Sequence, residues 1–201
     1  LEDIYPPYRP KRKTRASVAR GKGLQPLADR ILEQVPFDLS SEASRYIDTE
    51  KGVFSEEEAL TGARDIIAEL ISEHVESRSV IRELFLEKGV FESKVISGKE
   101  EAGVKYRDYF EWKEPVKTAP SHRILAMRRG EKELILTLDI YPPAEEAIML
   151  LEKIFITGSN QISEQVKLAL ADSYKRLLKP SLETEIRLFT KKRADEEAIR
   201  V

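Results

Sequence analysis

A stretch near the start of the sequence combines positive charge with aromatic rings. Its cations follow one another with no acidic residue among them: Arg9, Lys11, Arg12, Lys13, Arg15, Arg20 and Lys22. Tyr5 and Tyr8 come directly before them. Guanidinium and ammonium groups neutralise phosphates and release counterions, and tyrosine rings can stack on unpaired bases. The stretch indicates contact with RNA or single-stranded DNA. The alternative is a solvated linker, or cations that pair with the acids of another domain.

The residues that catalysis requires are not grouped anywhere in the sequence. His74 and His122 are its only histidines and lie far apart in different expected helices, and there is no cysteine. Glycine-rich phosphate loops, a Gly-x-Ser-x-Gly turn and a His-Glu-x-x-His pair do not occur either. Adjacent glutamates such as Glu145 and Glu146 point in different directions on a helix and cannot share one substrate. We therefore expect no catalytic residue, no metal site, no cofactor and no enzymatic activity.

The overall composition restricts the classes of partner. The chain has 34 basic and 36 acidic residues among 201, so its net charge of −2 gives no global attraction for nucleic acid. Any such affinity must come from local clusters. The lack of cysteine excludes disulfides and favours a cytoplasmic location, and no apolar run is long enough to cross a membrane.

Periodicity and stop signals predict a mainly α fold. An extended, basic and proline-rich arm covers residues 1–13, and short helices are expected at 14–20, 26–34 and from Ser40 or Ser41 to Ile47. Ser55 and Glu58 form a capping box that starts a helix of about five turns. Further helices are expected at 78–89, 121–129 and 144–155, from Ser163 to a break before Pro180, and from near Ser181 onward.

Two segments favour strands, at about residues 90–97 and 133–140, and we expect them to pair as a small antiparallel hairpin or sheet. The aromatic stretch 106–112 between them reads as a helix that anchors the sheet to the helices, rather than as a base-stacking platform. These elements suggest an arm at 1–13, a helical subdomain at 14–89, a mixed α/β subdomain at 90–142 and C-terminal helices at 143–201.

Several short stretches resemble the Tex family of bacterial transcription accessory proteins. They are LEDIYPPYRPKRKTRA at 1–16, KGLQPLA at 22–28, RELF at 82–85, KYRDYF at 105–110, PSHR at 120–123 with RGE at 129–131, and LKPSLETE at 178–185. The resemblance extends along all 201 residues. One departure is Leu134, where glycine would be expected at the start of the hairpin.

The resemblance implies that the chain is the central helical region of a longer protein, before an RNase H-like domain, with helix-hairpin-helix and RNA-binding domains elsewhere. It implies a nucleic-acid-binding parent, and for this segment a scaffold with an auxiliary contact to RNA or single-stranded DNA at the basic stretch. An alternative is a protein-interaction module that docks on transcription machinery or on other domains and binds no nucleic acid itself.

Overall fold

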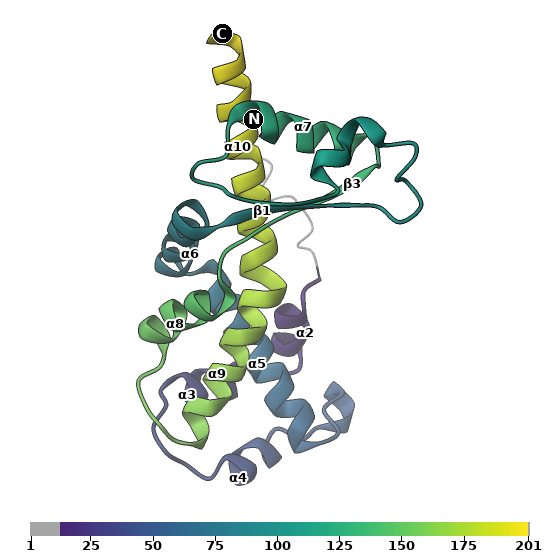
Figure 1. Ribbon diagram of the computed structural model, residues 1–201. Coiled ribbons are helices and arrows are strands. Elements are labelled where there is room, and N and C mark those ends of the chain that lie inside the picture. The colour runs from purple at the N-terminus through teal and green to yellow at the C-terminus, as the bar shows by residue number, and fades with distance from the viewer. Residues whose placement is uncertain (1–12, 201) are drawn as a thin grey trace, which may run out of the picture. The chain divides into compact units, whose positions relative to one another are not determined.

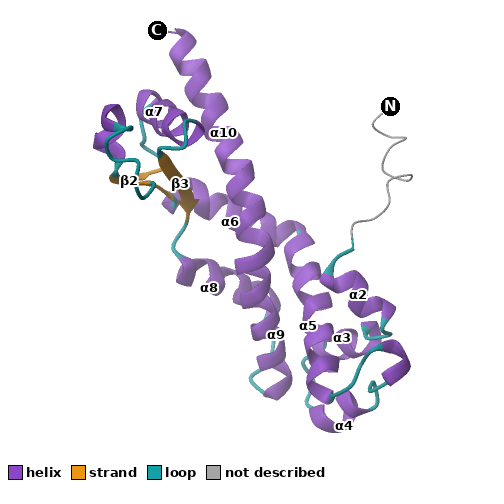
Figure 2. Cartoon of the chain, turned by 90° about the vertical axis from the view of Figure 1, so that its right-hand side faces the viewer, coloured by secondary structure: helices purple, strands orange, loops and turns teal. Residues whose placement is uncertain are grey.

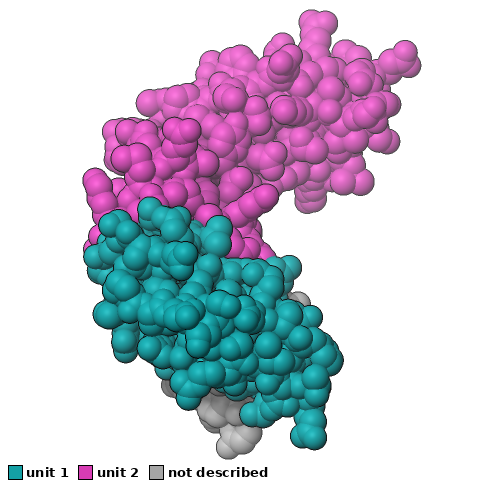
Figure 3. All heavy atoms as spheres, turned by 90° about the horizontal axis from the view of Figure 1, so that it is seen from below, with its two compact units in different colours: residues 1–70, 156–170 teal, residues 71–155, 171–201 magenta. Residues whose placement is uncertain are grey.

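The computed structural model describes residues 13–200. The chain is mainly α-helical with one small antiparallel sheet, as predicted from the sequence (Figure 1). It forms two compact units (Figure 3). Unit 1 comprises the chain up to Leu70 together with Ile156–Leu170, and unit 2 comprises Ile71–Phe155 together with the chain from Ala171 onward. Both units are discontinuous in sequence, whereas the division predicted at 14–89, 90–142 and 143–201 follows the chain and stays a prediction.

The helices of unit 1 begin at local capping signals. Its elements are α2 (Arg15–Gly21), α3 (Gln25–Leu32), α4 (Leu39–Ser44), the 3-10 turn η1 (Thr49–Lys51), most of α5 (Glu56–Glu73) and most of α9 (Gln161–Ser173). The predicted cap of α5 at Ser55 is confirmed, because the Glu58 amide donates to Ser55 Oγ at 3.1 Å. The return bond differs from that of a capping box: the Glu58 carboxylate accepts from the Phe54 amide at 2.7 Å, one residue before Ser55. The start of α4 differs from the prediction, because the Asp38 side chain caps it and Ser41 donates to that side chain.

Unit 1 contains a close approach between helices and a buried helix end. A Cβ added at Gly62 of α5 would lie 2.3 Å from Leu24 Cδ1, so a side chain there would displace the buried Leu24. Gln34 follows α3 with a φ of 57° and is 6% exposed. Its side-chain oxygen accepts from the Thr157 amide at 2.9 Å, and its carbonyl accepts from Asn160 Nδ2 at 3.1 Å. Gln34 thereby ties the 157–160 loop to the end of α3.

Unit 2 contains the sheet, which is drawn in orange in Figure 2, and its strand order is β2-β1-β3. The strands are β1 (Val90–Val95), β2 (Glu111–Pro115) and β3 (Leu136–Tyr141), all paired antiparallel. Two of them match the predicted strands. The prediction of a helix over 106–112 is confirmed only in part: a 3-10 helix, η2 (Val104–Tyr109), covers its start, whereas Glu111 and Trp112 belong to β2. The aromatic residues nevertheless pack as predicted, because Tyr106 forms a core cluster with Ile135 and Leu136.

Two helices of unit 2 contact β3 of the sheet, α7 (Ser121–Lys132) and α10 (Lys179–Arg200). The helix α10 also packs against α7 and α6 (Val75–Lys88), and α6 packs against α8 (Ala144–Phe155). At the β3 edge, the Ile140 amide donates to Glu183 Oε1 at 3.0 Å, and Arg187 Nη2 donates to the Leu138 carbonyl at 3.1 Å. These side chains use backbone groups that would otherwise pair with another strand.

The end of α7 differs from the predicted stop at Gly130. Gly130 lies inside the helix. A Cβ there would be 2.5 Å from Leu136 Cδ1 and 2.9 Å from its Cγ, so only glycine permits this close approach of α7 to β3. The helix ends instead in a Schellman motif, in which the Ile135 amide donates to the Gly130 carbonyl and the Leu134 amide to the Glu131 carbonyl, both at 3.0 Å. Leu134 occupies the left-handed position with a φ of 62°. The residue that departs from the expected glycine therefore adopts a glycine-like conformation.

The predicted helix break at Pro180 is wrong. A π-helical turn, η3 (Tyr174–Leu178), joins α9 to α10 without interruption. Proline has no amide hydrogen and clashes with the carbonyl four residues earlier, and a wider turn before Pro180 accommodates both effects. Tyr174 opens the turn, and burial raises its pKa to about 12.

Candidate nucleic-acid interface

Four of the nine predicted contact residues fall in the described part of the chain. Lys13 precedes α2, Arg15 and Arg20 lie on α2, and Lys22 is the residue after it. The other five are outside the described residues: Tyr5, Tyr8, Arg9, Lys11 and Arg12. The described cations lie in unit 1 and do not all have the same surroundings.

The sequence of α2 places its cations away from the protein interior. Ala16 and Ala19 are buried, whereas Arg15 and Arg20 are exposed. A capping box starts the helix: the Ser17 amide donates to Thr14 Oγ1 at 3.0 Å, and the Thr14 amide donates to Ser17 Oγ at 2.8 Å. Small side chains on one face and a strong cap allow so short a helix to hold charged residues on its other face.

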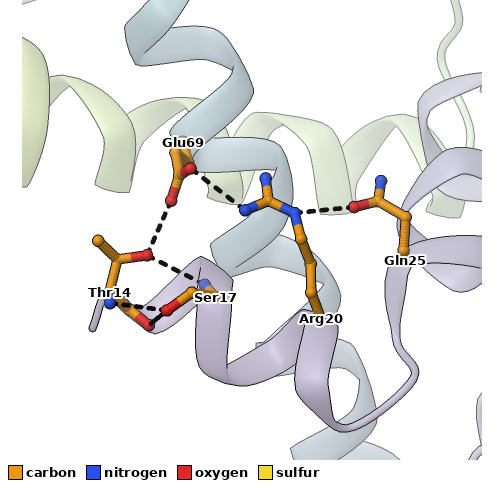
Figure 4. A network of polar contacts seen from close by, with 5 residues as sticks. All are labelled: Thr14, Ser17, Arg20, Gln25 and Glu69. Atoms are coloured by element: carbon orange, nitrogen blue, oxygen red, sulfur yellow. Dashed lines mark hydrogen bonds and ion pairs between the residues drawn. The ribbon is translucent and has the colours of Figure 1, made fainter. Parts of the chain in front are cut away.

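One carboxylate of α5 binds both ends of α2 (Figure 4). Glu69 Oε2 accepts from Thr14 Oγ1 at 3.0 Å, and Glu69 Oε1 pairs with Arg20 Nη1 at 3.3 Å. Arg20 Nε also donates to Gln25 Oε1 at 3.0 Å. Arg20 is therefore engaged within unit 1, and it is the predicted contact residue with the clearest structural role.

Arg15 and Lys22 instead line a groove of about 500 Å³. Its other walls include Val18, Phe54 and the first turns of α5. Phe54 is 63% exposed. Neither Arg15 nor Lys22 forms an ion pair with another residue in the described range 13–200. The groove thus combines two available cations with an exposed aromatic ring, which are the groups that contact backbone and bases of single strands.

Three acidic residues line the groove, Glu57, Glu58 and Asp65, and the first two are bound within unit 1. Glu58 accepts from the Phe54 amide, and Glu57 Oε1 pairs with Arg64 Nη2 at 2.8 Å. Arg64 in turn donates to Gln165 at 2.6 Å. These carboxylates serve the cap of α5 and its packing against α9, so they do not directly neutralise Arg15 and Lys22.

Two left-handed glycine turns shape one end of this region. Gly23 has a φ of 80° and Gly52 a φ of 84°. Lys22 Cε lies 3.6 Å from the position of a Cβ on Gly52, and Lys51 Nζ lies 3.4 Å from that of a Cβ on Gly23. Side chains at either glycine would crowd these lysines. The turns therefore bring Lys51 next to the predicted cations.

Phe54 and Lys51 were missed by the sequence analysis. Both are separated from α2 by the helices α3 and α4, and only the tertiary fold brings Phe54 to the groove and Lys51 beside Gly23. Neither residue belongs to a motif, so the sequence carries no signal for their role.

The histidines have ordinary structural surroundings. His74 precedes α6 and packs its ring edge-on against Phe155, with ring centroids 5.2 Å apart, while His122 is exposed on α7. In the part of the chain that the structure describes, no group of three His, Asp or Glu side chains could hold a metal ion. No helix among residues 13–200 is both long and apolar enough to span a bilayer.

Comparison with known proteins places this helical chain in one family. The family model described as Tex central region-like matches residues 36–201. Protein YdcI of Bacillus subtilis is 45% identical over the whole chain, and YhgF of Escherichia coli is 36% identical over the whole chain. The transcriptional accessory protein Tex of Neisseria gonorrhoeae is 40% identical over 74% of this chain and 19% of its own length.

The chain belongs to the Tex family of transcription accessory proteins and matches its central region. It spans 28% of the length of YdcI and 27% of the length of YhgF. The match to the central region begins after α2 and α3, so the basic helix lies outside that match but inside the full-length similarity to YdcI and YhgF.

Proposed function

We propose that this chain is a helical scaffold without catalytic activity that contacts RNA or single-stranded DNA through its basic segment. In this proposal the predicted cations from Arg9 to Lys22 bind phosphates, and Tyr5, Tyr8 and Phe54 stack on bases. Arg20 instead holds α2 in place through Glu69. The chain thereby serves a longer protein that works beside nucleic acid and the transcription machinery.

The observation that carries the proposal is the pairing of available cations with an exposed ring at the α2 groove. Arg15 and Lys22 have no ion pair among the described residues, and Phe54 is 63% exposed beside them. An exposed phenylalanine is a stacking platform for any base, and flanking cations supply a salt-sensitive backbone contact. The similarity to a protein named as a transcriptional accessory protein supports the same class of ligand.

The test is fluorescence anisotropy of labelled oligo(U) and oligo(dT), about 16 nucleotides long, with the full 201-residue chain. Titrations at about 50 mM and about 200 mM salt give both the affinity and its salt dependence. We expect R15E/K22E to weaken binding about tenfold at low salt and to reduce the slope of log affinity against log salt by about 1.4. F54A should weaken binding without changing that slope, because stacking releases no counterion.

The matched control is K99E/R107E. Both residues are exposed, lie in unit 2 and have no side-chain partner in the described range, and this variant changes the net charge by the same amount. Equal affinities for R15E/K22E and K99E/R107E would remove the groove from the proposal. If the unaltered chain shows no binding at low salt, the alternative of a protein-interaction module becomes the better account.

A further inference from the structure

Two basic clusters that are distant in the sequence meet in unit 2. Arg128, Arg129 and Lys132 lie on α7, and Lys191 lies on α10. The two helices pack against each other and leave a groove of about 500 Å³ between them, lined by these four cations. In the sequence, each cluster is interleaved with acids and reads as ordinary surface.

The acids in the groove are already used. Glu131 forms ion pairs with Arg187 and, at 3.5 Å, with Arg128. Asp195 pairs with Lys191 at 2.7 Å, one turn away on the same helix. Glu131 is also needed inside unit 2, because Arg187 donates to the backbone of β3. These carboxylates leave a positive excess in the groove.

Arg129 and Lys132 carry that excess. Both side chains are exposed, and neither forms an ion pair with any residue between 13 and 200. Their spacing of three residues places them on one face of α7. The negative C-terminal end of the α7 dipole stabilises cations at these two positions. It does not explain the presence of Lys191 in the groove, because Lys191 lies in the middle of α10.

The lining also indicates the kind of ligand. Among the described residues that line the groove, Leu125 is the only apolar one. An acidic amphipathic helix binds mainly through a row of apolar anchors, which this lining does not provide. A sugar-phosphate backbone requires cations that can contact successive phosphates, and guanidinium groups match phosphate oxygens in a bidentate way.

We infer that the groove between α7 and α10 is a second contact for the phosphodiester backbone of single-stranded nucleic acid. The inference rests on the proposed function for its class of ligand, but it concerns different residues in the other unit. Arg129 and Lys132 bind phosphates, Leu125 contacts the sugars, and Arg128 and Lys191, each paired with an acid of the groove, border the site.

The test compares R129E/K132E with the control K99E/R107E in the anisotropy titrations with oligo(U) and oligo(dT). Circular dichroism and the fluorescence of Trp112, the only tryptophan, establish that the variants are folded. We expect about tenfold weaker binding at about 50 mM salt and a slope of log affinity against log salt reduced by about 1.4. If charge reversal disturbs the fold, R129Q/K132Q removes the charges while keeping helix-forming side chains.

The outcomes separate this inference from the proposed function. If R129E/K132E binds like the control while R15E/K22E is weakened, the α7 groove is overturned and the proposed function stands. If only R129E/K132E is weakened, the α7 groove stands and the α2 groove fails. A polyglutamate peptide of similar charge that displaces the oligonucleotide as well as an unlabelled oligonucleotide does would overturn the assignment to nucleic acid.

Discussion

Unit 1 and unit 2 use the same two backbone devices in different surroundings. Each has a glycine inside a helix that permits a close contact, Gly62 in α5 and Gly130 in α7. Each also has a non-glycine residue of positive φ directly after a helix, Gln34 in unit 1 and Leu134 in unit 2. Gln34 is buried and hydrogen-bonded, whereas Leu134 is 68% exposed.

The difference between Gln34 and Leu134 shows that a non-glycine residue can occupy a left-handed position for different reasons. At Gln34 the side chain satisfies a backbone amide of the 157–160 loop, so the left-handed conformation is linked to a contact that glycine could not make. At Leu134 the side chain is 68% exposed, so little of it is available for packing. The backbone conformation alone therefore does not tell how a substitution will affect stability.

The largest effect is expected from alanine at the helix glycines. Gly130→Ala should lower the free energy of unfolding by about 2 kcal/mol, because its Cβ meets both Cδ1 and Cγ of the buried Leu136. Gly62→Ala should cost about 1 kcal/mol, since its one overlap is with Leu24 Cδ1 at the end of a side chain, Ala19 Cβ lies at an ordinary 3.4 Å, and alanine gains helix propensity. Urea unfolding followed by circular dichroism measures both.

Gly21→Ala is the control for these variants. A Cβ at Gly21 meets nothing within 4 Å, so this change should be neutral or stabilising by up to about 1 kcal/mol. Trp112 belongs to unit 2, and its fluorescence separates the units. A Gly62→Ala chain whose fluorescence and circular dichroism transitions shift together would show that the two units unfold as one.

Glycine at the two left-handed positions should have opposite effects. Gln34→Gly should lower the free energy of unfolding by about 1 to 2 kcal/mol, because the Thr157 amide loses its acceptor. Leu134→Gly should raise it by about 0.5 to 1 kcal/mol, because glycine adopts positive φ without steric cost. The same urea titrations give both values. Destabilisation by Leu134→Gly would mean that the leucine side chain contributes packing that its exposure does not reveal.

Local signals account for what the sequence predicts well. The helix α8 runs over the predicted residues 144–155, since Pro142 and Pro143 precede it and acids fill its first turn. The strand β2 was not predicted because Glu111–Pro115 has no clear alternation and is defined by its pairing with β1. The helix break predicted at Pro180 was wrong because the π turn that accommodates this proline has no sequence signature.

The same distinction applies to the candidate site. A run of cations without acids is visible in the sequence, but the binding of Arg20 by Glu69 depends on a residue 49 positions away. Tertiary packing likewise brings Phe54 to the α2 groove, and it brings Arg129 and Lys191 to the same groove between α7 and α10. Sequence therefore predicts where charge is concentrated, and the fold decides which charges are available.

The smallest effect concerns an ion pair between α6 and α10 in unit 2. Arg82 donates two hydrogen bonds to Glu185, one of them from Nη2 at 3.2 Å, and this hydrogen bonding lowers the pKa of the Glu185 carboxyl. A carboxyl with a lowered folded pKa contributes stability above its unfolded pKa of about 4.3, and that contribution is lost as the pH falls through the folded value. Because the two side chains are 39% and 41% exposed, solvent screening keeps the contribution below about 1 kcal/mol.

Glu185→Gln should therefore destabilise the chain near neutral pH and flatten its loss of stability in acid. Urea unfolding between about pH 3 and about pH 6, followed by Trp112 fluorescence, measures this difference within unit 2. Glu83→Gln is the control, since Glu83 is exposed on α6 and forms no ion pair among the described residues. If the curves of Glu185→Gln and the unaltered chain run parallel, the pair contributes only through its neutral hydrogen bonds. The Arg82–Glu185 pair would then contribute to the specificity with which α6 and α10 pack, and not to the pH dependence of the free energy of unfolding.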